Sequence, residues 1–220
     1  MNLGVRSFLC ALALAGSICA QQTDAMNQIE GIVQLPPARP APAIASRYKI
    51  KAGAIAKPEP PRAVVYLDGL STGKPTNVRT NQILQKGYQF SPAILPIQVG
   101  SSVQFPNRDD DYHHVFSYSK AREFDLGRYL KTEEPRPIVF NKPGVVKVGC
   151  EIHDHMRAVI LVLNTPCFTV TDSQGKYRLL LQDVPPGKYT LKAWINEKIT
   201  REQPVEIKPG ASLRIDFAEK

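Results

Sequence analysis

Cysteine and histidine are scarce in this chain of 220 residues, which contains four of each. Two of the cysteines lie within the first twenty residues, so only Cys150 and Cys167 are available to the remainder. One pair cannot supply the dense disulfide framework of a small secreted domain. A chain of this length can instead bury one large or two small hydrophobic cores.

Long apolar runs are also missing beyond residue 20, as are clusters of basic residues. No later stretch approaches the roughly 20 apolar residues that a membrane helix needs, which predicts no transmembrane segment in the mature chain. The formal net charge is +8, but the basic residues are scattered, without the arginine clusters or interleaved aromatics of a nucleic-acid surface. We therefore expect no nucleic-acid partner. The basic balance favours an acidic protein partner.

The first twenty residues, MNLGVRSFLCALALAGSICA, are the most apolar segment of the chain. Arg6 precedes an apolar run that ends in small residues, which is the pattern of a secretory signal peptide. Cleavage is expected after Ala20. A lipid-attachment signal at Cys19 is the weaker alternative, because Ile18 stands where such a signal would have a small residue. The pattern predicts a signal peptide over 1–20 and export, with a bacterial periplasm as the destination.

Donor atoms for a metal are concentrated in one short string, GCEIHDHM, which contains Cys150, His153 and Met156. A further imidazole is available upstream at His113. A thiolate with two imidazoles and one thioether suits copper in a trigonal arrangement with a weak axial Met. Zinc rarely accepts a thioether, and calcium and magnesium prefer oxygen ligands. An isolated His or Met usually only packs, but the spacing of these donors predicts one copper site.

The sequence around these donors predicts strands. A Pro-Gly turn leads into the β-branched stretch VVKVGC, and the apolar run AVILVLN follows the donor string. Farther upstream, SSVQF, PNRDDDY and HHVFSYS are typical of a strand, a polar loop and a second strand. Donors so distant in sequence can meet only if a sheet brings the strand ends together at one pole of a sandwich or barrel.

The segment from about Gln89 to Leu163 resembles the cupredoxins of the plastocyanin and amicyanin type, through VGSSVQFPN, HHVF and KPGVVKVGCEIHDHM. The resemblance implies a Greek-key cupredoxin sandwich over 80–163 that holds one type 1 (blue) copper. His113, Cys150 and His153 would be the strong ligands and Met156 the weak axial one. The chain is most similar to plastocyanin-like proteins labelled methylamine utilisation proteins, a genomic association from which no methylamine oxidation follows.

Two histidines beside these ligands have open roles. His114 stands where many cupredoxins have Asn, so it could orient the ligands as a second-shell group, compete as a ligand, or face solvent. His155 lies between two ligands on a tight loop, and we expect it to point outward to solvent.

The chain also has a second group of strand patterns. Proline recurs from Leu35 to Arg62, which argues for an extended or irregular segment. After residue 164, the strings TVTD, KYRLLL, YTLKAW and LRIDF alternate between turns, which predicts a run of antiparallel strands. This tail resembles the prealbumin-like β-sandwich of carboxypeptidase regulatory-like domains.

The first strands of such sandwiches have counterparts far upstream, at Gly31–Val33 and Ala63–Leu67. We therefore predict an all-β chain in which a sandwich of residues 28–70 plus 164–220 contains the cupredoxin segment as an insertion. Two consecutive domains are the alternative, and strand pairing between the early and late segments would distinguish them.

The function that these features favour is one-electron transfer by an exported copper protein, with a partner approaching an exposed edge of His153. Copper binding or shuttling without a redox role, and a structural or binding role in the cell envelope, are the alternatives. An acidic redox protein such as a cytochrome is the expected partner, with Arg157 as a docking feature. We expect no enzyme, because four histidines are too few for an added catalytic copper centre and no hydrolase pattern is present.

Overall fold

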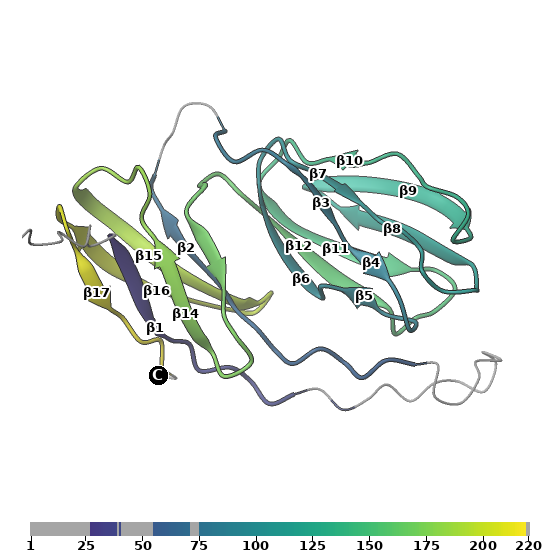
Figure 1. Ribbon diagram of the computed structural model, residues 1–220, viewed down its shortest axis with the longest axis horizontal. Coiled ribbons are helices and arrows are strands. Elements are labelled where there is room, and N and C mark those ends of the chain that lie inside the picture. The colour runs from purple at the N-terminus through teal and green to yellow at the C-terminus, as the bar shows by residue number, and fades with distance from the viewer. Residues whose placement is uncertain (1–26, 39, 41–54, 71–74, 219–220) are drawn as a thin grey trace, which may run out of the picture.

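The computed structural model describes residues 27–38, 40, 55–70 and 75–218, and these form two groups of strands that lie side by side (Figure 1). The described residues contain seventeen strands and no helix, so the predicted all-β class is confirmed. The described residues therefore offer no helix that could cross a membrane. The predicted signal peptide over 1–20 lies outside the described residues, as does most of the proline-rich segment.

The first group of strands contains the predicted metal ligands. Its largest sheet runs in the order β6 (Ile94–Gln98), β12 (Arg157–Leu163), β11 (Gly144–Cys150), β8 (His113–Ser119) and β9 (Arg122–Tyr129). The facing strands are β10 (Ile138–Val139), β7 (Ser102–Gln104) and β3 (Thr80–Gln82), with the pair β4 (Leu84–Gln85) and β5 (Phe90–Ser91). Phe105, Phe140 and Ile160 are fully buried between these layers.

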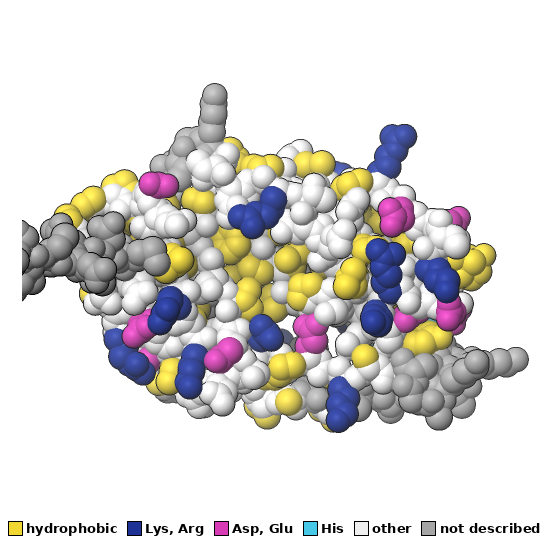
Figure 2. Space-filling view, viewed as in Figure 1, with side chains coloured by type: hydrophobic (Ala, Val, Ile, Leu, Met, Phe, Trp, Pro, Cys, Tyr) yellow, Lys and Arg dark blue, Asp and Glu magenta, His cyan; other side chains and the backbone are white. Residues whose placement is uncertain are grey.

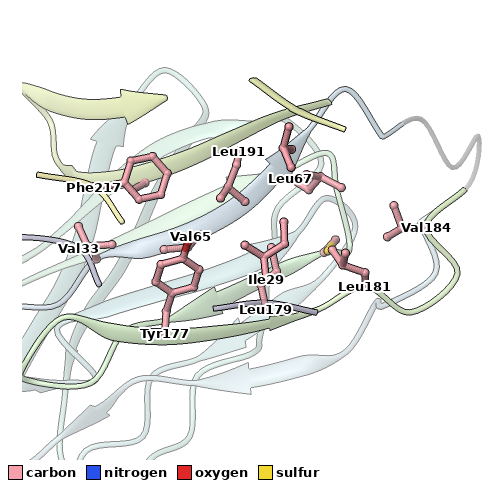
Figure 3. Packing of buried hydrophobic residues seen from close by; sticks show 14 of the residues in the cluster. Ile29, Val33, Val65, Leu67, Tyr177, Leu179, Leu181, Val184, Leu191 and Phe217 are labelled. Carbon is pink, nitrogen blue, oxygen red and sulfur yellow. The ribbon is translucent and has the colours of Figure 1, made fainter. Parts of the chain in front are cut away.

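The second group also has two sheets. One runs in the order β13 (Phe168–Val170), β2 (Val64–Asp68), β15 (Gly187–Asn196) and β16 (Ile199–Ile207). The other has β1 (Gln28–Ile32) between β14 (Lys176–Leu180) and β17 (Ser212–Arg214). Figure 3 shows the core between them, where Ile29 and Val65 from the early strands pack with Leu179 and Leu191 from the late ones.

Early and late parts of the chain are hydrogen-bonded within this second group. Strand β1 pairs with β14 in antiparallel and with β17 in parallel orientation. Strand β2 pairs with β13 and β15, both antiparallel. These are the pairings that an inserted arrangement requires. The domain boundaries, 28–70 plus 164–220 for the sandwich and 80–163 for the inserted segment, stay a prediction.

A third apolar cluster joins the two groups. It is formed by Val64, Leu161, Leu163 and Trp194, which come from β2, β12 and β15. Strand β2 alternates its side chains between this cluster and the core of the second group, and β12 alternates between it and the core of the first. Both strands are thus buried on two faces, which explains their nearly continuous apolar sequences. Figure 2 shows hydrophobic side chains gathered where the groups meet.

Candidate metal centre

Strand ends position the three strongest candidate ligands. Cys150 is the last residue of β11, and it is paired with Val115 of β8, two residues after His113 at the start of that strand. The loop after Cys150 is closed by its own backbone, because the Met156 amide donates to the His153 carbonyl (2.9 Å) and the Cys150 amide donates to the Met156 carbonyl (3.3 Å). The sheet therefore brings His113 to the compact ligand loop, which follows Cys150, the residue 37 positions later in the chain.

The donor atoms of His113, Cys150 and His153 form a small triangle. The Nδ1 atoms of the two histidines are 3.2 Å apart, and Cys150 Sγ lies 3.9 Å from His113 Nδ1 and 3.8 Å from His153 Nδ1. A point equidistant from the three atoms lies about 2.1 Å from each, which is close to the length of metal–nitrogen and metal–sulfur bonds. The residues present therefore fit a trigonal copper ion in both donor type and spacing.

The site is buried and its thiol is activated. The exposed fractions of His113, Cys150 and His153 are 0%, 5% and 3%. Burial opposes ionisation of Cys150, but hydrogen bonds from His113 and His153 outweigh burial and lower the pKa of the thiol well below its usual range. Burial also disfavours the imidazolium form of His113, yet its contacts with Asp109 and Cys150 raise its pKa. A thiolate is the form of Cys that binds metals.

Met156 lies in the same core as Cys150 and is 1% exposed. Its backbone bonds hold it at the end of the ligand loop. Its role as axial ligand stays a prediction. Cys167, by contrast, is buried in the core of the second group, where burial raises its pKa to about 12.

His114 contacts the site through its backbone and not through its ring. Its amide donates to Cys150 Sγ at 3.5 Å. Its imidazole turns away, with Nε2 2.5 Å from Asp125 and Nδ1 3.5 Å from Glu151. His114 therefore lies outside the donor triangle, where its backbone amide supports the Cys150 sulfur. A role of its ring in orienting the ligands stays a prediction.

Two expectations about exposure are wrong. The edge of His153 is not open to a partner as predicted: the ring of Tyr88 meets it edge-to-face at a centroid distance of 5.1 Å, and His153 is 3% exposed. His155 was expected to face solvent, but its ring is half-buried 6.2 Å from the His153 ring, and burial lowers its pKa. A strand pattern does not reveal such covering, because the turn that bears Tyr88 is distant in sequence from the ligand loop.

Asp109 is a further member of the site that the sequence analysis missed. Its Oδ2 lies 2.9 Å from His113 Nε2, on the side of the ring opposite the donor triangle. Carboxylates commonly orient metal-binding histidines in this way. The four-residue spacing between Asp109 and His113 is visible in the sequence, but it lies in a run of three aspartates whose orientations only the fold distinguishes.

Comparisons with known proteins give matches among solved structures alone. No family model and no curated protein matches the chain. A copper-containing nitrite reductase from Thermus scotoductus SA-01 is 26% identical, with a TM-score of 0.36, and the match covers 42% of this chain and 23% of that one.

A purple cupredoxin from Nitrosopumilus maritimus is 23% identical over 38% of this chain and 99% of its own, with a TM-score of 0.34. Amicyanin from Paracoccus versutus is 17% identical over 45% of this chain and 97% of its own, also with a TM-score of 0.34.

Proposed function

We propose that this protein is an electron carrier that holds one type 1 copper through His113, Cys150 and His153, with Met156 as the axial ligand. The observation that carries the proposal is the buried triangle of two imidazoles and one low-pKa thiol, with edges of 3.2, 3.8 and 3.9 Å. Bound copper would supply a one-electron couple between Cu(I) and Cu(II).

The residues around the triangle suit electron transfer better than copper delivery. Cys150 and His113 are fixed at the ends of paired strands, and the ligand loop is closed by backbone hydrogen bonds. Donors on rigid elements keep one geometry while the charge on the metal changes. Burial of all three donors also hinders an external ligand that would remove the metal. The protein would therefore retain copper and exchange electrons.

The proposed setting is the periplasm, after removal of the signal peptide over 1–20. The proposed partner is an acidic redox protein such as a cytochrome, which the net charge of +8 would attract. Arg157 is exposed at the start of β12, immediately after the ligand loop, and is a candidate contact for that partner. Lys and Arg are scattered among acidic groups on the face in Figure 2, so steering would come from the overall charge.

The visible spectrum of the Cu(II)-loaded mature protein tests this function. We expect an intense thiolate-to-copper band that Cys150→Ser abolishes, because serine cannot supply the thiolate. Cys167→Ser is the matched control, since Cys167 is buried in the other core, and it should leave the band unchanged. An unchanged spectrum in Cys150→Ser would rule out the proposed site, and a pale spectrum in the unaltered protein would favour copper shuttling.

A further inference from the structure

The turn between β4 and β5 has an unusual backbone at Tyr88. The φ angles of Gly87 and Tyr88 are +64° and +56°, and the Lys86 amide closes the turn by donating to the Gln89 carbonyl at 3.1 Å. Glycine adopts this left-handed region readily, but a residue with a side chain rarely does. Such a conformation persists where the surroundings fix it, and it often coincides with a functional site.

Asp109 fixes this turn and the candidate ligand His113 at the same time. Its carboxylate accepts hydrogen bonds from the Gly87 amide (2.7 Å) and the Tyr88 amide (3.0 Å), and it contacts His113 Nε2 (2.9 Å). The Asp109 amide in turn donates to Asn107 Oδ1 at 2.9 Å. One nearly buried carboxylate therefore joins the left-handed turn to the metal site.

The ring of Tyr88 covers both candidate histidine ligands. It meets His113 edge-to-face at 5.7 Å and 83°, and His153 at 5.1 Å and 84°. Its hydroxyl donates to Asp111 Oδ2 at 3.3 Å. Edge-to-face ring pairs are stabilising beyond the area that they bury. A molecule that is to reach the donor triangle past Tyr88 must break both ring contacts.

We infer that Tyr88 determines what the metal site can exchange: it excludes external copper ligands from His113 and His153, and Asp109 is the positioning residue that keeps it there. The inference rests on the proposed function and deepens it. With the ring in place, a soft-donor copper ligand cannot displace the imidazoles, whereas an electron can still pass through the aromatic contact. Tyr88, and not the edge of His153, is then the surface that a redox partner meets.

Copper release from the Cu(I)-loaded protein to excess bathocuproine disulfonate, a soluble Cu(I) chelator, tests the inference. Tyr88→Ala and Tyr88→Leu should each release copper about tenfold faster, because both ring contacts are lost. Tyr88→Phe keeps the ring and should behave like the unaltered protein. Asp109→Asn should give an intermediate rate and faster hydrogen exchange at the Gly87 and Tyr88 amides. Tyr118→Ala is the matched control, since that tyrosine is 73% exposed on β8.

A second measurement does not depend on copper. In the apo protein, acylation of His153 by diethyl pyrocarbonate, located by mass spectrometry, should be slow and should become faster in Tyr88→Ala but not in Tyr118→Ala. Failure of the unaltered protein to bind copper would reject the proposed function. The acylation rates would still show whether the Tyr88 ring covers His153. Release and acylation in Tyr88→Ala that both match the Tyr118→Ala control would overturn the inference.

Discussion

Two adjacent histidines on β8 have different environments because successive side chains of a strand point to opposite faces of the sheet. His113 is fully buried and directs Nδ1 at the donor triangle, whereas the ring of His114 lies between Asp125 and Glu151 at the sheet surface. The backbone amide of His114 nevertheless reaches Cys150 Sγ. Position 114 therefore needs an amide for the site but does not need an imidazole.

The first prediction at this scale compares the two histidines. His114→Ala should keep the copper band and lose at most about 1 kcal/mol of unfolding free energy, because the contacts of its ring with Asp125 and Glu151 are partly exposed. His113→Ala should weaken copper retention sharply, since it removes one corner of the triangle. Spectra and competition with a copper chelator would check both variants. Loss of the band in His114→Ala, with retention in His113→Ala, would reverse the assignment of the two residues.

The donors of the triangle could be predicted from the sequence, whereas their surroundings could not. Thiolate, imidazole and thioether groups at close spacing have a distinctive chemistry, and strand alternation distinguishes His113 from His114. No comparable sequence pattern identifies Asp109 and Tyr88. Their roles depend on a left-handed turn that the strand pairing places beside the ligand loop, so the tertiary fold decides them.

At the scale of elements, β1 is confined closely between its two neighbours. Gly31 pairs with Tyr177 of β14, and a Cβ atom at Gly31 would lie 1.8 Å from the carbonyl oxygen of Ile215. No side chain fits such an approach between backbones. Gly31 is therefore required by packing and not by backbone conformation, since its φ angle is outside the left-handed region.

We predict that Gly31→Ala destabilises the protein by about 1–3 kcal/mol, because the strand must move away from β17 to admit the methyl group. Gly187→Ala is the matched control, since its nearest contact would be an ordinary 3.4 Å to a tyrosine ring. Urea denaturation followed by circular dichroism measures both. Equal midpoints for the two variants would show that the β1 packing described above is incorrect.

The long strands could also be predicted from the sequence, and the short ones could not. VVKVGC and AVILVLN became β11 and β12 because β-branched runs between turn residues have few other stable arrangements. Strands β4, β5 and β10 have two residues each, too few to show alternation. They form because their neighbours in the sheet offer hydrogen-bonding partners.

At the scale of the whole molecule, the cluster around Trp194 couples the two groups of strands. Trp194 is 7% exposed and packs with Val64, Leu161 and Leu163. We predict that Trp194→Ala costs about 3–5 kcal/mol and that calorimetry then resolves two thermal transitions where the unaltered protein has one. Ile199→Ala, at a residue 39% exposed on the neighbouring strand, is the control. Equal effects of the two substitutions would mean that the Trp194 cluster does not couple the two groups.

The pairing of the earliest strands with the latest ones sets an order of assembly. Strand β1 cannot acquire either neighbour until β14 and β17 have been synthesised, so its pairing has high contact order and is slow. The loop that separates β1 from its late partners is effectively shortened once the strands between Thr80 and Leu163 have folded. The chain then leaves β2 and returns beside it, where the Leu67 amide donates to the Cys167 carbonyl at 3.0 Å. Loop closure then costs less entropy. We therefore expect the first group of strands, which contains the metal site, to fold before the second group and to hold the early and late strands of the second group close together.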